Sequence, residues 1–218
     1  MKKCVYLAAL LLGFSLSWGA DISWALEVIK LEEPVLNKGK TVMESLQSRR
    51  SEREYGEKAL SDIQLSEVIW AAGGVNRRDG DKIIGYTYPN SYNDQAMSVY
   101  AFTKDGIYLY DPAEHSLKPY IKGDHRAESG VQSYIASAPL NLLYVVDLSR
   151  MTGETEDERL QVASMNAGHM SANVYLYAAS EGLNAICRSH IDRDELRVLL
   201  KLPAHFEPLL AQTVGFPK

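Results

Sequence analysis

Apolar positions recur at helical spacing in two segments of the first half of the chain. The segment 41–49 places its apolar residues on one helical face, and these are Val42, Met43 and Leu46. A second pattern begins after Ser61, which is suited to cap a helix because Gln64 follows three residues later. It predicts a helix as far as Ala72, ended by the two glycines that follow.

The longest helical pattern lies in the second half of the chain, between residues 154 and 180. Its apolar residues recur every three or four positions: Leu160, Ala163, Ala167, Met170, Val174 and Ala178. Gly182 is placed to end this helix. Small residues along it favour close packing against another helix. A further short helix is predicted over 194–200.

Strand patterns alternate with these helices. Two β-rich runs, 99–103 and 106–110, flank a turn and predict a hairpin. The apolar run 142–146 is typical of a buried central strand, and shorter strands are predicted at 185–187 and 208–214. The polar, Gly-containing stretch 76–95 reads as a long loop. Together these elements predict one α+β domain over residues 41–218.

The N-terminal twenty residues have the pattern of a signal peptide. Lys2 and Lys3 precede an apolar run, and small residues near Ala20 provide a cleavage site. We therefore expect an exported protein, located in the periplasm, with an arm over 21–40 after the cleaved segment. An uncleaved N-terminal anchor is the alternative. Cleavage would remove Cys4 and leave Cys187 alone, which excludes an intramolecular disulfide and a cysteine metal cluster.

Composition narrows the classes of function. The chain has 218 residues, 46% of them hydrophobic, and a formal net charge of −5. That is enough apolar content for a core. No stretch is basic enough to follow a nucleic-acid backbone, so we expect no nucleic-acid partner, and no stable membrane partner. The five histidines show no ligand-like spacing, and we predict no metal site.

Three short motifs carry candidate chemistry. Residues 48–53 read SRRSER, and their guanidinium and hydroxyl groups suit an anion such as phosphate. The same composition also occurs at a solvated helix end. Residues 89–95 read PNSYNDQ, whose amides suit the edge of a heteroaromatic ring but also a polar turn. Residues 213–218 read TVGFPK and carry little information alone.

In this order the three motifs resemble the FMN-dependent nitroreductase family. The family begins with Arg-Arg/His-Ser-x-Arg/Lys, continues with Pro-Ser-x-x-Asn-x-Gln and ends in a Val-Gly-Tyr/Phe-Pro strand. The stretch 106–117 also looks like the branch that includes the azoline dehydrogenases. The resemblance covers about residues 42–218. Two departures are that Asn90 stands where the family has Ser, and that no Lys-Tyr pair like that of azoline oxidation is evident.

The resemblance implies a set of cofactor-binding residues. An FMN phosphate would be held by Arg49, Arg50, Ser51 and Arg53, with Lys218 assisting from the chain end. Asn93 and Gln95 would meet the isoalloxazine edge or the ribityl chain. Backbone groups of Arg188, Ser189 and His190 would lie near flavin N5. No side chain is expected to act as a catalyst in its own right.

The resemblance also implies a fold and an activity. The expected fold has a central, mainly antiparallel sheet flanked by helices, in an intertwined homodimer with FMN at the interface. The expected activity passes a hydride through flavin N5 to an electron-poor small molecule such as a nitro compound or quinone. NAD(P)H is the candidate electron donor, although export puts that donor in doubt. The alternative is an exported, non-catalytic ligand-binding protein that kept the fold.

Overall fold

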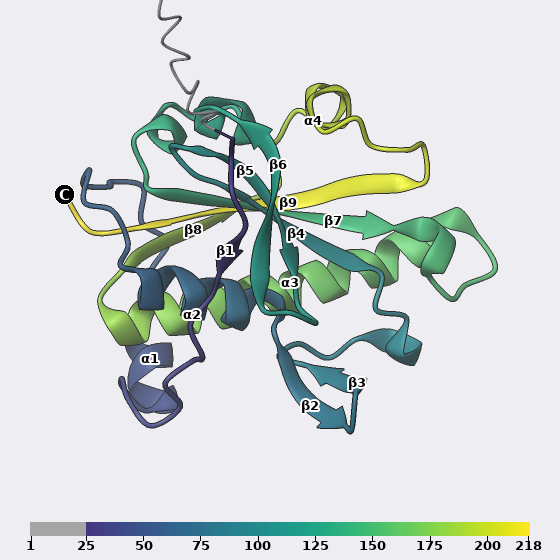
Figure 1. Cartoon of the computed structure of the whole chain (residues 1–218), viewed down its shortest axis with the longest axis horizontal. Coiled ribbons are helices and arrows are strands. Elements are labelled where there is room, and N and C mark those ends of the chain that lie inside the picture. Colours follow the sequence, from purple (N-terminus) through teal and green to yellow (C-terminus); the bar gives the residue numbers. More distant parts are fainter. Residues whose placement is uncertain (1–24) are drawn as a thin grey trace, which may run out of the picture.

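A seven-stranded antiparallel sheet is the centre of the computed structural model, which describes residues 25–218 (Figure 1). The strand order is β1-β6-β5-β4-β7-β9-β8. The strands are β1 (Ile29–Lys30), β4 (Met97–Phe102), β5 (Gly106–Asp111), β6 (Ser116–Lys122), β7 (Leu140–Asp147), β8 (Asn184–Arg188) and β9 (Phe206–Gly215). All of their pairings are antiparallel, which confirms the predicted sheet. The predicted signal peptide, residues 1–20, lies outside the described residues.

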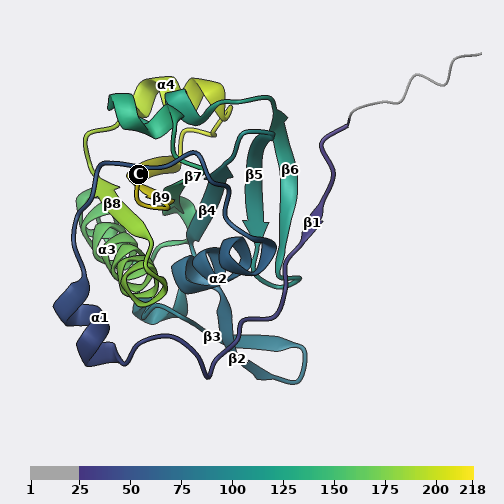
Figure 2. The same cartoon turned by 90° about the vertical axis from the view of Figure 1, so that its left-hand side faces the viewer.

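Helices cover both faces of this sheet (Figure 2). They are α1 (Val42–Ser48), α2 (Asp62–Gly73), α3 (Glu156–Glu181) and α4 (Arg193–Leu199). Figure 2 looks nearly along α3, which lies with α2 on one face, while α4 lies on the other. Over residues 25–218 none of the helices has the length and apolarity to cross a membrane.

The helix ends follow the predicted signals. Ser61 caps α2 and Gln64 reciprocates, so both members of the capping box are present. Thr155 and Glu158 do the same for α3. Gly182 ends α3 with a left-handed φ of 70°, a conformation that glycine adopts without steric cost.

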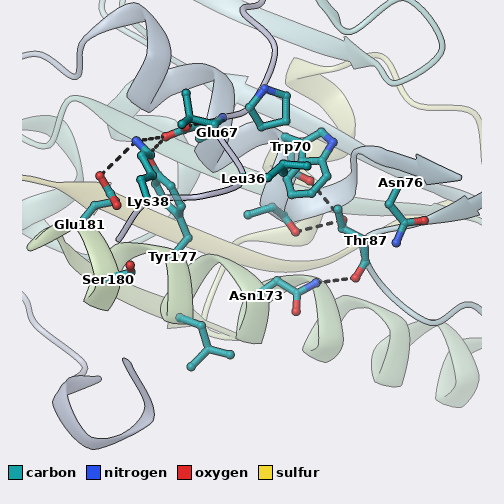
Figure 3. A pocket seen from close by; sticks show the side chains of 14 residues that line it. Leu36, Lys38, Glu67, Trp70, Asn76, Thr87, Asn173, Tyr177, Ser180 and Glu181 are labelled. Carbon is teal, nitrogen blue, oxygen red and sulfur yellow. Dashed lines mark hydrogen bonds and ion pairs between the residues drawn. The ribbon is translucent and has the colours of Figure 1, made fainter. Parts of the chain in front are cut away.

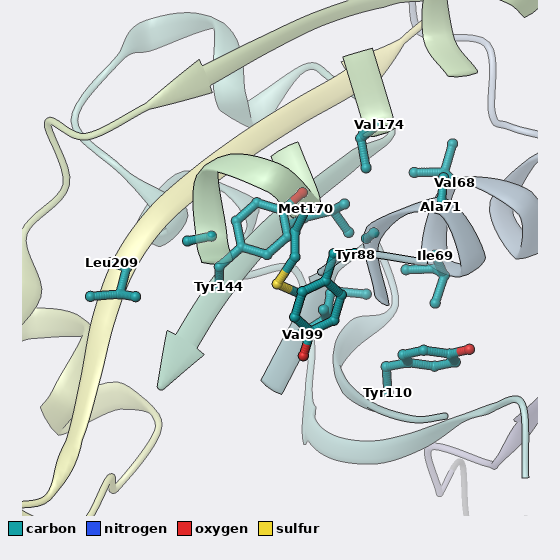
Figure 4. Packing of buried hydrophobic residues seen from close by; sticks show 14 of the residues in the cluster. Val68, Ile69, Ala71, Tyr88, Val99, Tyr110, Tyr144, Met170, Val174 and Leu209 are labelled. Carbon is teal, nitrogen blue, oxygen red and sulfur yellow. The ribbon is translucent and has the colours of Figure 1, made fainter. Parts of the chain in front are cut away.

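Side chains of β7 alternate between two cores. Leu142 and Tyr144 face α2 and α3, whereas Leu143 and Val145 face α4. Figure 4 shows how Met170 of α3 packs between the rings of the first core. This two-sided burial explains why residues 142–146 form an uninterrupted apolar run.

The prediction of a long loop over 76–95 is wrong. Residues Val75–Asp79 and Lys82–Tyr86 form a two-stranded hairpin, β2 and β3, outside the main sheet. The side chains of β2 are mostly exposed, so no apolar alternation marks the strand. Beyond the hairpin the chain turns through a short 3-10 segment at Ser91–Asn93.

The strand registers define two ends of the sheet. Met97 pairs with Val146, and Val146 pairs with Glu207, at the end where β9 begins. At the opposite end Asn141 pairs with Thr213, near the C-terminus of the chain. The loop that precedes β4 and the chain end that follows β9 therefore lie at opposite ends of the strands, as Figure 1 shows.

Candidate functional site

The segment that follows α1 runs alongside β8 and the end of β9. The Glu52 amide donates to the Ala185 carbonyl at 3.0 Å, and the Asn184 side-chain amide donates to the Glu54 carbonyl at 2.8 Å. Gly56 N–H donates to the Phe216 carbonyl at 2.9 Å. These bonds fix the Arg-rich segment against the edge of the sheet.

Gly56 brings the chain end close to this segment. A Cβ atom built on Gly56 would lie only 3.0 Å from the Pro217 carbonyl oxygen and 3.8 Å from Lys218 Cα. Any side chain at this position would be in tight contact with the Pro217 carbonyl. The glycine therefore places the terminal lysine beside the segment that carries Arg53.

Side chains of residues 49–51 differ in their contacts. Arg49 and Ser51 both contact Tyr175 of α3. The Arg50 guanidinium donates instead to the carbonyls of Gln47 and Arg49 at 3.0 Å. Arg50 also lines a 210 Å³ pocket, and Tyr175 lines that pocket too. The structure thus brings Arg49 and Ser51 into direct contact with Tyr175 and leaves Arg50 at a pocket that Tyr175 also borders.

Tyr175 connects three parts of the site. Its hydroxyl lies 3.0 Å from Ser51 Oγ and accepts a hydrogen bond from the Cys187 amide at 2.8 Å. The Arg49 guanidinium carbon lies 5.4 Å from the centre of its ring, within the range of a cation–π contact.

A cavity of about 520 Å³ opens beside the end of β8. Its volume lies within the usual range for small-molecule sites. Three of its lining residues, Arg188, Ser189 and His190, were predicted to lie near flavin N5, and Arg53 lines it as well. The full lining is Arg53, Gln132, Ser133, Tyr134, Ile186, Cys187, Arg188, Ser189 and His190.

The Arg188 side chain is buried although its backbone borders the cavity. It is 5% exposed, and its guanidinium donates to the Ser129 carbonyl, Gln132 Oε1 and Asn141 Oδ1. Burial lowers the pKa of this guanidinium. Its Nε has no hydrogen-bond partner among the described residues. The side chain therefore anchors the loop that carries Gln132 to the wall of the cavity.

Asn93 and Gln95 lie at the other end of the sheet, in a strained loop. Tyr92, Asn93 and Gln95 have φ values of 53°, 56° and 51°, in the left-handed region that is costly for residues other than glycine. Tyr86 donates to Gln95 Oε1 at 3.2 Å, and Asp94 accepts two bonds from Thr152. Within one chain these amides do not join the arginine cluster.

Comparisons with known proteins agree with this arrangement. The model of the nitroreductase family matches residues 46–216. A Methanocaldococcus jannaschii protein named "putative nitroreductase" is 31% identical over 197 residues, which are 87% of this chain and 92% of that protein. The chain belongs to the nitroreductase family. The resemblance inferred from its three motifs is thereby confirmed.

Solved structures of the nitroreductase family share the fold. A Ralstonia eutropha JMP134 crystal structure, also named "putative nitroreductase", matches with a TM-score of 0.81 and 37% identity, over 88% of this chain and 90% of that one. The E. coli microcin synthetase McbBCD complex matches with a TM-score of 0.65 over 86% of this chain and 79% of that one. Its 18% identity makes this a likeness of fold alone.

Members of the nitroreductase family typically bind FMN. Three residues of the candidate site were not predicted from the sequence: Tyr134 and Cys187, which line the cavity, and Tyr175, which contacts Ser51. Tyr175 lies on α3, outside the series of apolar residues that predicts the buried face of this helix. Its role depends on a contact with a segment 124 residues away. No sequence signal other than the abundance of tyrosine pointed to it.

A second cavity of about 390 Å³ lies between α2, α3 and the arm over residues 34–38 (Figure 3). Glu67 is buried in its wall and accepts bonds from Lys38 Nζ at 2.6 Å, Tyr177 OH at 2.7 Å and the Val35 amide at 3.0 Å. None of the ten predicted site residues lines this cavity.

Burial opposes the charge of Glu67, but hydrogen bonds from Lys38, Tyr177 and Val35 outweigh this effect and lower the pKa of the carboxyl group.

Over residues 25–218 no group of His, Cys, Asp and Glu side chains is arranged to hold a metal ion.

Proposed function

We propose that this nitroreductase-family protein is an FMN-dependent oxidoreductase that reduces an electron-poor small molecule, such as a nitro compound or a quinone. The observation that carries the proposal is the placement of Arg49, Ser51 and Arg53. Arg49 and Ser51 contact Tyr175, whose hydroxyl accepts from the amide of Cys187, and both Cys187 and Arg53 line the 520 Å³ cavity. The family match gives this placement its meaning.

The residues present fit the phosphate of FMN. Among the described residues, no carboxylate forms an ion pair with Arg49 or Arg53; their side-chain contacts are with the Tyr175 ring and the Ser51 carbonyl. In contrast, Arg126 and Arg197 pair with Asp124 and Glu207. Guanidinium groups without a carboxylate partner suit a doubly charged phosphate, and the backbone of Lys218 lies close to Gly56, three residues after Arg53.

The residues also fit the flavin ring. The cavity next to this segment has room for a planar group, and Tyr134 and Ile186 provide apolar surface in it. Ser189 and His190 are exposed at its rim and supply polar groups to the ring edge. When bound, FMN would supply hydride transfer at N5. The chain's residues would bind the phosphate and orient the ring.

A second copy of the chain would complete the site. Asn93 and Gln95 lie at the opposite end of the sheet from Lys218, so they reach the cofactor only from another subunit. The exposed apolar side chains of Val42, Met43 and Met165 on α1 and α3 support such an interface. We therefore include the homodimer in the proposal.

Export and the electron donor are parts of the same proposal. The N-terminal sequence favours a periplasmic protein, and NAD(P)H is not available there. We propose that another reductant serves as the physiological donor. The test measures how fast NADPH reduces the purified protein in an extract of its own compartment. A rate that matches those of nitroreductase-family enzymes would contradict this part of the proposal.

The absorption spectrum of the purified protein tests the central proposal. We expect the bands of oxidised flavin, released as FMN on denaturation. The double substitution Arg49→Ala and Arg53→Ala should remove the bands while the circular dichroism spectrum stays unchanged. Arg77→Ala, an exposed arginine on the β2 hairpin, is the matched control and should retain them. A colourless protein that stays colourless after incubation with FMN would support the non-catalytic alternative.

A further inference from the structure

One hydroxyl group joins the proposed phosphate segment to the strand that borders the flavin cavity. Tyr175 OH lies 3.0 Å from Ser51 Oγ and 2.8 Å from the Cys187 amide nitrogen. Ser51 belongs to the segment after α1, and Cys187 belongs to β8. Tyr175 itself belongs to α3, so the hydroxyl connects three elements that are distant in sequence.

One of these two hydrogen bonds has a fixed direction. The Cys187 amide can only donate, so the Tyr175 oxygen accepts from it. In the bond with Ser51 either hydroxyl can be the donor. When an anion accepts the Ser51 proton, the Tyr175 hydroxyl can donate to Ser51 Oγ in turn. The Tyr175 hydroxyl therefore suits a Ser51 that donates to a phosphate.

The aromatic ring of the same residue holds a second anion-binding group. The Arg49 guanidinium carbon lies 5.4 Å from the centre of the Tyr175 ring. A cation–π contact of this kind orients a guanidinium without neutralising its charge. Arg49 therefore keeps its full charge for an external anion, which an ion pair with a carboxylate would reduce.

The position of Tyr175 along α3 makes it a rigid support. Its neighbours Val174 and Ala178 are almost fully buried in the core against the sheet. The backbone of this turn of the helix is thus fixed, and only the tyrosine ring extends toward the Arg-rich segment. A support held by the core is more precise than one on a loop.

We propose that Tyr175 is a positioning residue of the proposed FMN site, which orients Ser51 through its hydroxyl and Arg49 through its ring toward the phosphate. The inference rests on the proposed function and extends it to Tyr175, which would act on the cofactor only through Ser51 and Arg49. With phosphate bound, Tyr175 donates to Ser51 and Ser51 donates to the phosphate, and the Tyr175 ring leaves the Arg49 charge free.

The test compares the affinities for FMN and riboflavin, because riboflavin lacks only the phosphate. The ratio used is the dissociation constant for riboflavin divided by that for FMN. It reports the contribution of the phosphate contacts. Tyr175→Phe keeps the ring and removes the hydroxyl, and it should lower the ratio about five- to tenfold. Tyr175→Leu also removes the ring and should lower it further. Riboflavin affinity should change less than FMN affinity in both variants.

Two further variants separate positioning from a structural role. Ser51→Ala should lower the ratio as Tyr175→Phe does. The double variant should match Ser51→Ala alone, because the hydroxyl acts through Ser51. Tyr177→Phe loses the hydrogen bond to Glu67 two residues along the same helix, and it should leave the ratio unchanged. An unchanged ratio in Tyr175→Phe, or additive effects in the double variant, would overturn the proposal.

The same measurements distinguish a failure of this inference from a failure of the proposed function. If the wild-type protein binds neither flavin, the proposed function is wrong and this inference falls with it. If the wild-type protein prefers FMN and Tyr175→Phe keeps that preference, only the role of Tyr175 is wrong. Equal loss of FMN and riboflavin affinity in Tyr175→Phe would show a structural role and would also overturn the inference.

Discussion

The Lys38 ammonium lies 2.6 Å from the Glu67 carboxylate, which is only 3% exposed. This ion pair fastens the N-terminal arm to α2, and the Tyr177 hydroxyl and the Val35 amide complete the carboxylate's hydrogen bonds (Figure 3). A buried carboxylate with these partners depends on each of them, because an uncompensated charge in the interior is costly.

Removal of the Glu67 side chain should destabilise the protein. Glu67→Ala leaves Lys38 without its nearest partner and the Tyr177 hydroxyl without an acceptor. We expect the free energy of unfolding to fall by about 2–4 kcal/mol, measured by urea denaturation. Lys30→Ala is the control, since its pair with Glu114 is exposed on both sides and should contribute little. Equal effects of the two substitutions would contradict the role of the buried pair.

The same carboxyl group predicts a dependence of stability on pH. Its pKa is lower in the folded protein than in the unfolded chain, so the unfolded state binds more protons as the pH falls. The stabilisation is complete above the unfolded pKa of about 4.3 and is lost as the pH falls through the folded value. Glu67→Gln should reduce this loss. Urea unfolding of the wild-type protein and of Glu67→Gln between pH 3 and pH 7, at steps of about one unit, measures this loss of stability. Parallel pH profiles of the two proteins would contradict the role of the Glu67 carboxyl group.

Substitution of Gly56 should weaken the proposed phosphate site. A valine Cβ there would press on the Pro217 carbonyl, and its methyl groups would add to this contact, so the chain end must shift and carry Lys218 with it. We expect Gly56→Val and Lys218→Ala each to lower FMN affinity about two- to fivefold, the range of an exposed ionic contact. Fluorescence titration measures both. Wild-type affinity in Gly56→Val would mean that the position of the chain end is not important.

Charge on the exposed face of α3 should disrupt the proposed dimer. Met165 is 53% exposed, although methionine is usually buried in a core or an interface. Met165→Glu would place a carboxylate in that interface, so we expect the sedimentation coefficient to fall to that of a monomer. Lys82→Glu on the β2–β3 hairpin is the charge control. A wild-type monomer at micromolar concentration would reject the interface itself.

Much of the fold follows from local signals. Ser61, Gln64 and Gly182 mark helix ends because capping depends on residues only a few positions apart. The β2–β3 hairpin was missed because its strands cover no core and therefore lack an apolar period. Strand β6 was missed because Lys118 and Pro119 interrupt its pattern.

The candidate site could be predicted only in part. The motif around Ser51 pointed to the segment that carries the proposed phosphate site, but in that sequence Arg49 and Arg50 look equivalent. They differ in the structure because Arg49 meets the Tyr175 ring whereas Arg50 donates to the carbonyls of Gln47 and Arg49. The role of Tyr175 depends on a tertiary contact with Ser51, which no local pattern encodes.

The separation of Gln95 and Lys218 at opposite ends of the sheet also has a consequence for dilution. In the proposed homodimer each cofactor site would combine residues of both chains. Cofactor binding and self-association would then be linked equilibria, so each should strengthen the other. On that proposal, dilution should release flavin from the wild-type protein without a change in intrinsic affinity, and added FMN should hold the two chains together.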